Sequence, residues 1–162
     1  MFLLLFSFLL ACPIEAQEIT SFRAHAKSSG IVDVDFSPDG NQILTAGMDS
    51  TAALWDVKGT LLSTFKPGDE VKRVSFSPDG KWIATASGKE IQVWNAKTAK
   101  LLNRMTPEES VLNIAFGPDS KAIVVSVSIN HLELWDFQAG KLLQTLEFSA
   151  NSALIFIFLP QG

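Results

Sequence analysis

The chain has 162 residues and a formal net charge of −4, with 47% hydrophobic and 19% charged residues. This is the composition of a globular protein, and the length allows one domain or two small ones. The acidic balance and the scattered lysines and arginines argue against a nucleic-acid partner. The single cysteine, Cys12, and the two histidines, His25 and His131, argue against a disulfide framework or a metal centre, and no other cofactor is expected.

Residues 2–12 form an uncharged apolar run that is too short to span a membrane, which takes about 20 apolar residues. The run has the length of the apolar core of a signal peptide, so we predict that residues 1–16 are a leader. Cleavage after Ala16 and lipidation of Cys12 are the two alternatives for its processing. We therefore expect a secreted or periplasmic protein that contacts a membrane only through the leader, if this is retained or lipidated. The other alternative is a cytoplasmic chain whose apolar start is a strand or a helix.

Three copies of one sequence pattern follow at a spacing of 40 residues. FSPDG occupies residues 36–40 and 76–80, and FGPDS occupies residues 116–120. A Trp comes 18 or 19 residues after each Phe, and a Leu-Leu pair follows each Trp. The residues that define the repeat are Phe36, Pro38, Asp39, Gly40, Phe76, Pro78, Asp79, Gly80, Trp94, Phe116, Pro118, Asp119, Trp135 and Asp136.

The pattern divides residues 17–162 into units of about 24–65, 66–105 and 106–148, with a partial unit at 149–162. Each complete unit is expected to form four short strands. In the second unit, apolar segments of about five residues are separated by turn residues, and Ser77 to Gly80 has the composition of a type I turn. Four short strands that recur every forty residues are typical of the blades of a β-propeller.

The Phe-Ser-Pro-Asp-Gly turn and the Trp-Asp end, at this spacing, resemble the WD-repeat family of β-propellers. The resemblance implies an all-β fold: an incomplete β-propeller of about three four-stranded antiparallel blades plus the first strand of a fourth, preceded by the signal-like apolar segment. It also implies a buried hydrogen-bonded network in the first unit, formed by His25, Thr45, Asp49 and Trp55. The other two units have Gly88 and Ile129 in place of the Asp and lack the His. They are therefore expected to depend on apolar packing.

No arrangement of residues predicts catalysis, and we expect that the chain is not an enzyme. His25 with Asp49 is interpreted as part of the structural network rather than as a catalytic base and its orienting acid. His131 is expected to be a solvated turn residue, and Glu108 with Glu109 a solvated loop. There is no nucleophile elbow and no glycine-rich phosphate loop.

The loops that join successive blades carry charges of both signs, which favours a protein or peptide partner. Trp82 has no aromatic counterpart in the other units, and it is either a partner anchor or a residue packed between blades. We therefore predict a non-catalytic scaffold; the alternative is an exported accessory or gating domain of a hydrolase or peptidase system. The candidate contact residues are Trp82, Lys27, Asp69, Glu70, Glu108 and Glu109.

Three blades and a fraction are too few to close a ring, because a propeller has at least four blades. The N-terminal strand at residues 18–23 and the apolar segment at 153–159 are expected to form unpaired edges. The chain is then either a fragment of a longer propeller or a piece that needs another chain to complete it.

Overall fold

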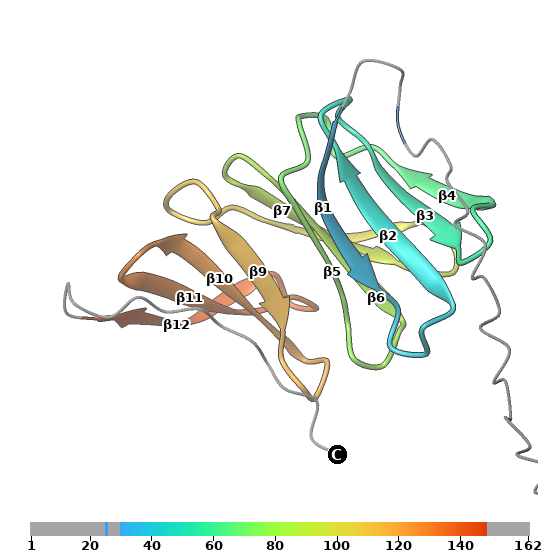
Figure 1. Cartoon of the computed structure of the whole chain (residues 1–162). Coiled ribbons are helices and arrows are strands. Elements are labelled where there is room, and N and C mark those ends of the chain that lie inside the picture. Colours follow the sequence, from blue (N-terminus) through green and yellow to red (C-terminus); the bar gives the residue numbers. More distant parts are fainter. Residues whose placement is uncertain (1–24, 26–29, 149–162) are drawn as a thin grey trace, which may run out of the picture.

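The computed structural model describes residue 25 and residues 30–148, which form three four-stranded antiparallel sheets (Figure 1). No helix occurs among these described residues. We call the sheets blades 1, 2 and 3 in chain order. Blade 1 comprises β1 (Ile31–Phe36), β2 (Gln42–Gly47), β3 (Ala52–Asp56) and β4 (Leu61–Phe65); blade 2 comprises β5 (Arg73–Phe76), β6 (Trp82–Ser87), β7 (Glu90–Asn95) and β8 (Leu101–Met105); blade 3 comprises β9 (Asn113–Phe116), β10 (Ala122–Ser128), β11 (His131–Asp136) and β12 (Lys141–Glu147).

Each blade is a meander in which every strand pairs with the next one in the sequence. The repeated turn sequence produces the first reversal. In blade 1, the Ser37 hydroxyl donates to Asp39 Oδ1 at 2.6 Å, and Gly40 N donates to Ser37 O at 2.8 Å. Gly40 has φ of 70°, a left-handed conformation that costs glycine no steric penalty. The turn therefore fixes the register of β1 against β2.

The third and fourth strands of each blade carry the same irregularity. The pairing register shifts between Leu54 and Trp55, between Val93 and Trp94, and at the matching place in blade 3. An extra residue of this kind increases the local twist of the ladder. Because the irregularity recurs at the repeated Trp of each unit, the three copies of the sequence adopt the same backbone arrangement.

The hydrophobic core lies between the blades rather than within one of them. One buried cluster joins β2, β3 and β4 of blade 1 to blade 2, and a second joins blade 2 to blade 3. Phe65 of blade 1 meets Trp94 of blade 2 edge to face, with ring centroids 5.6 Å apart. Phe116 and Phe137 of blade 3 meet in the same way at 5.2 Å. Each blade is thus stabilised by the apolar surface that it buries against its neighbour.

Trp82 belongs to this packing. Its half-buried ring lies against the core shared by blades 2 and 3, and its centroid is 6.0 Å from that of Phe137. Of the two alternatives for Trp82, packing between blades is therefore the one that the structure supports, and the alternative of a partner anchor is not supported.

The three blades lie side by side in an arc, and they do not close into a ring within the described residues (Figure 1). Strands β1, β5 and β9 are neighbours at the inner side of this arc. The predicted leader, the strand at 18–23 and the apolar segment at 153–159 lie outside the described residues. Within the described part, no helix is both long enough and apolar enough to cross a bilayer.

Candidate functional site

The predicted network of blade 1 is present. His25 is buried, and its Nε2 lies 2.9 Å from Thr45 Oγ1, to which Trp55 Nε1 donates at 3.0 Å. On the other side of the ring, His25 Nδ1 lies 3.0 Å from Asp49 Oδ1 and 3.1 Å from Thr51 Oγ1. Thr51 is an addition that the sequence did not predict.

Thr45 Oγ1 is the centre of this network. It accepts from the indole N–H of Trp55, lies within hydrogen-bond distance of His25 Nε2, and donates to the carbonyl of Ala53 at 3.3 Å. The remaining ring nitrogen, Nδ1, carries its hydrogen toward the Asp49 carboxylate, which also accepts from the Thr51 hydroxyl at 2.6 Å. The side-chain hydrogen bonds of this network tie residue 25 to the sheet.

Gly47, at the end of β2, makes room for the His25 ring. A Cβ built on Gly47 would lie 2.2 Å from His25 Nδ1 and 2.7 Å from Asp49 Oδ1, which no real Cβ can do. Ser87 occupies the matching position in blade 2, where the sequence has no histidine. Glycine at residue 47 is thus required by the presence of His25.

Blade 2 keeps half of this arrangement and replaces the other half. Trp94 Nε1 donates to Thr85 Oγ1 at 3.0 Å, as in blade 1. In the absence of a histidine, the buried Gln92 amide donates to the carbonyl of Pro67 at 2.9 Å and to Glu90 Oε1 at 2.7 Å. Gln92 therefore ties the connection between blades 1 and 2 to the sheet.

Blade 3 uses a buried carboxylate instead. Glu133 is only 2% exposed, and its Oε2 accepts from Trp135 Nε1 at 2.8 Å. Its Oε1 accepts from the backbone N–H of Glu108 at 3.1 Å, in the connection from blade 2. The expectation that blades 2 and 3 rely on apolar packing is therefore wrong: each has its own polar link to the preceding connection.

His131 also differs from its prediction. It is the first residue of β11 rather than a solvated turn residue, and it is half-buried. Its Nε2 atom is buried and has no hydrogen-bond partner among the described residues. Because alternate residues of a strand lie on the same side, His131 lies on the same side of β11 as Glu133 and Trp135.

A further link between blades escaped the sequence analysis. Asp33 Oδ2 accepts from Val74 N at 3.0 Å, and Asp35 Oδ2 accepts from Phe76 N at 2.7 Å, so two carboxylates of β1 bind the backbone of β5. Burial raises the pKa of Asp35, although the N–H groups of Phe76 and Phe36 act in the opposite direction. Asp alternates with apolar residues along β1. This pattern could have indicated that both sides of the strand make contacts, one through carboxylates and the other through apolar side chains.

Comparison with known proteins finds similarity to WD-repeat proteins. The family model described as WD domain, G-beta repeat, matches residues 16–56 and 59–95. An uncharacterized WD repeat-containing protein of Synechocystis sp. is 35% identical over 54 residues, which make up 33% of this chain and 16% of that protein. The crystal structure of the RRP9 WD40 repeats matches with a TM-score of 0.69 at 24% identity, over 79% of this chain and 41% of that one. Residues 16–95 thus match WD repeats, and the described residues have the fold of a WD-repeat propeller.

The predicted fold class is confirmed for the described residues, which form three four-stranded antiparallel blades of an unclosed propeller. The predicted first strand of a fourth blade lies outside these residues. The chain spans 16% and 41% of the lengths of the two relatives named above. WD-repeat propellers are in general non-catalytic scaffolds for protein interactions. Among the described residues of this chain, no group of three or more His, Cys, Asp or Glu side chains could hold a metal ion.

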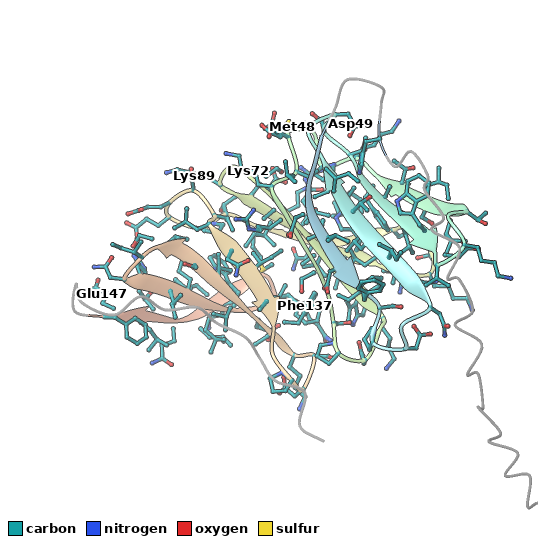
Figure 2. All side chains as sticks on the ribbon, in the orientation of Figure 1. Met48, Asp49, Lys72, Lys89, Phe137 and Glu147 are labelled. Atoms are coloured by element: carbon teal, nitrogen blue, oxygen red, sulfur yellow. The ribbon has the colours of Figure 1, made fainter. Side chains whose placement is uncertain are left out.

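The loops at one end of the blades form what we call the upper face. It comprises the turns after β2, β6 and β10 and the two connections between blades, at residues 66–72 and 106–112. Figure 2 shows Met48, Asp49, Lys72 and Lys89 along this edge of the arc. The predicted contact residues of the two connections are exposed on it, whereas Lys27 lies outside the described residues; those exposed are Asp69, Glu70, Glu108 and Glu109.

The lower face, at the other end of the blades, uses its carboxylates within its own turns. Asp56 Oδ1 accepts from Lys58 N and Thr60 N at 2.9 and 2.7 Å. Asp136 Oδ1 accepts from Gln138 N and Ala139 N, both at 2.9 Å. These carboxylates stabilise their own turns by accepting backbone hydrogen bonds. They are therefore less available to a partner than the exposed carboxylates of the upper face.

Proposed function

We propose that this chain is a non-catalytic scaffold that binds a protein or peptide partner through its upper face. The observation that carries the proposal is the distribution of exposed apolar side chains. Met48 and Ile129, in turns after β2 and β10, are exposed, and so are Ile31 and Leu112 at the starts of β1 and β9. Of the described turn residues of the lower face, only Val57 is a large exposed apolar residue, although Phe36, Leu61 and Leu101 are exposed at the strand ends beside these turns. Apolar side chains on loops are the usual anchors of a protein interface.

The charges beside these anchors suit a polypeptide. Lys89 Nζ donates to the carbonyl of Glu108 at 2.7 Å, which brings a cation next to the exposed carboxylates of the connection at 106–112. The other connection has Lys66 next to Asp69 and Glu70, all exposed. A rim of mixed sign fits a partner with side chains of both signs better than it fits a phosphate backbone.

Affinity capture with matched variants tests this proposal. We expect the wild-type chain to retain at least one protein that the double variant Met48→Glu/Leu112→Glu loses, because the new charges would be buried against an apolar partner surface. The lower-face variant Lys97→Glu is the control and should retain that protein. Identical sets of captured proteins for all three chains would contradict binding through the upper face.

We propose in addition that the chain is exported through residues 1–16. The uncharged apolar run at residues 2–12 supports this proposal. Mass spectrometry of the chain expressed in a secreting bacterium should find loss of the leader after Ala16 or processing at Cys12. Recovery of the intact chain, starting at Met1, from the cytosol would contradict export.

A further inference from the structure

The first strands of the three blades have backbone groups to satisfy along their inner edges. β1, β5 and β9 lie next to one another at the inner side of the arc, and each is the edge strand of its own sheet (Figure 1). Along such a strand, successive N–H groups point alternately toward the sheet and away from it. The N–H groups that point away need an acceptor from outside their sheet.

Between blades 1 and 2, two carboxylates are these acceptors. Asp33 Oδ2 accepts from Val74 N at 3.0 Å, across 41 residues. Asp35 Oδ2 accepts from Phe76 N at 2.7 Å, across the same separation. Ser77 N, the next group along the chain, donates into the sheet, to a carbonyl of β6 at 2.9 Å. The inner edge of β5 is therefore satisfied by acids of β1.

The same positions between blades 2 and 3 hold no acid. Arg73 and Ser75 of β5 take the places of the two Asp residues of β1. The N–H groups 41 residues further on belong to Ile114 and Phe116. Gly117 N donates to a carbonyl of β10 at 2.8 Å, so these two N–H groups point away from β10. Within residues 30–148, no acceptor for either of them is found.

Blades 2 and 3 stack in the same register as blades 1 and 2. At the lower end of the two blades, Asp79 N donates to Ser120 Oγ at 3.1 Å, again across 41 residues. The same separation relates Arg73 to Ile114. The guanidinium group of Arg73 therefore extends from the position from which Asp33 reaches the backbone of β5.

Arg73 is a half-buried cation with no carboxylate at ion-pair distance among the described residues. Its Nη1 donates to the backbone carbonyl of Lys72 at 2.7 Å. A guanidinium group has five N–H donors, so most of them are left for another acceptor. Asn113, exposed at the start of β9, adds amide donors beside Ile114. Donors thus gather where the equivalent joint between blades 1 and 2 has acceptors.

We propose that the inner edge between β5 and β9 binds a carboxylate group. One oxygen of the carboxylate accepts from Ile114 N, as Asp33 accepts from Val74 N between blades 1 and 2, and the other accepts from the guanidinium group of Arg73. Both hydrogen bonds are assisted by charge, which makes them stronger than bonds between neutral groups.

The place of the site indicates how a carboxylate reaches it. Arg73 begins β5 and Ile114 is the second residue of β9, so both lie next to the connections that form the upper face. Two sources have the required chemistry: an Asp or Glu side chain of the partner and a free organic acid. The first source rests on the proposed function, whereas the carboxylate site itself does not.

Nuclear magnetic resonance of the full ¹⁵N-labelled chain gives the first test. A short capped glycine peptide with one Asp is titrated at constant ionic strength and about pH 7, where the Asp is ionised. The amide proton of Ile114 should move downfield until the site is saturated, whereas that of Val74, which already has an acceptor, should not move. The same peptide with Asn is the control. No saturable shift, or an equal shift with the Asn peptide, would overturn the proposal.

Two matched variants separate the site from general attraction by charge. Arg73→Gln should weaken binding of the Asp peptide about tenfold, because one charge-assisted hydrogen bond is lost. Lys72→Gln removes the same charge from the adjacent, exposed side chain and should leave the affinity nearly unchanged. If the two variants weaken binding equally, the peptide responds to net charge and the proposal is wrong.

A third variant supplies the carboxylate from within the chain. Arg73→Asp gives β5 the acid that β1 has at the equivalent position. Without any ligand, its Ile114 amide proton should lie downfield of the wild-type position, and the Asp peptide should no longer bind. A chain with an unchanged circular dichroism spectrum that still binds the peptide would overturn the proposal.

Acetate and sulfate, titrated at the same ionic strength, distinguish the sources. Tighter binding of the Asp peptide than of acetate assigns the site to an acidic side chain of a partner, and equal binding assigns it to a free organic acid. Sulfate that binds as tightly as either would overturn selection of a carboxylate. The capture experiment with Met48→Glu/Leu112→Glu uses none of these ligands, so failure of the carboxylate site and failure of the proposed function are observed separately.

Discussion

Blades 1 and 3 differ in how they satisfy the indole N–H of the repeated tryptophan. In blade 1 the acceptor is a hydroxyl on the second strand, Thr45, and a histidine from outside the sheet continues the chain of hydrogen bonds. In blade 3 the acceptor is a carboxylate on the third strand, Glu133, which lies two residues before Trp135. The need to satisfy a buried donor is common to the repeats, but the residue that meets it is not.

The difference also concerns what each network holds in place. The blade 1 network binds His25, which precedes the first strand, whereas Glu133 binds the backbone of Glu108 in the connection from blade 2. Both networks therefore anchor the segment that enters a blade. Since the loops of the upper face are parts of these segments, the networks also fix the surface through which we propose that the partner binds.

The largest effect is expected from removal of the blade 3 acceptor. Glu133→Ala should lower the free energy of unfolding by about 3 kcal/mol, because it leaves the N–H groups of Trp135 and Glu108 without acceptors in a buried site. Chemical denaturation measures the loss. Glu147→Ala, at an exposed position of the neighbouring strand, is the control and should change stability by less than about 0.5 kcal/mol.

A second substitution sharpens the comparison between the two blades. Val125 of β10 pairs with Glu133, just as Thr45 of β2 pairs with Ala53. The double variant Val125→Thr/Glu133→Ala therefore builds the blade 1 arrangement into blade 3, and it should recover part of the lost stability. If it is no more stable than Glu133→Ala, the two acceptor positions are not interchangeable.

The next effect in size concerns the space for His25. Gly47→Ala should cost about 2 kcal/mol, because the new Cβ displaces the ring and overpacks the site. The cost should fall when His25→Ala is present, since the Cβ then meets no ring. Ser87→Ala, at the matching position of blade 2, is the control and should have a small effect. Equal costs of Gly47→Ala with and without His25 would show that the glycine is needed for another reason.

Local patterns predicted those features of the fold that repeat in the sequence. The turn at residues 76–80, with Pro setting φ and Gly accepting a left-handed conformation, indicates a strand reversal without any knowledge of the rest of the chain. The blade 1 network could be predicted because its four residues match the family pattern one by one. The turn was thus predicted from residue types at short range, and the network from the family resemblance.

Contacts that join different units could not be predicted in this way. Glu133 stands between Leu132 and Leu134, a position typical of an exposed acid on a strand with one apolar side. Only the fold shows that it is buried beneath the connection at residues 106–112. Asp33 and Asp35 likewise bind backbone groups 41 residues away, to which no sequence pattern points. Whether a side chain is buried depends on residues that are close in space but distant in the sequence. The residues that replace the missing histidine in blades 2 and 3 could therefore not be predicted from the sequence.

Loss of the Asp49 carboxylate should have a smaller effect than either change above. Asp49→Ala should cost about 1–2 kcal/mol, because His25 Nδ1 and the Thr51 hydroxyl lose their shared acceptor at a site that is partly open to water. Thermal unfolding measures the change, with the exposed Lys97→Ala as the control. Matched losses for the two variants would contradict a role for Asp49 in the network.

The smallest effect concerns acid stability and contrasts a turn carboxylate with the half-buried Asp35. The hydrogen bond from the Ser37 hydroxyl, with those from Asn41, lowers the pKa of Asp39 from 3.8 to about 2. A lowered folded-state pKa contributes stability that is present above the unfolded value and is lost as the pH falls through the folded one. The difference in thermal midpoint between the wild type and Asp39→Asn should therefore shrink between pH 3.8 and about 2.

Asp35 should show the opposite sign. Because burial raises its pKa above 3.8, its ionised form opposes folding, and the contribution of Asp35 to stability becomes less favourable as the pH rises from 3.8 through the raised folded-state pKa. The thermal midpoint of the wild type should therefore fall relative to that of Asp35→Asn with increasing pH. The difference in thermal midpoint from the wild type should thus change with pH in opposite directions for the two variants. If it changes in the same direction for both, Asp39 and Asp35 do not lie in contrasting environments.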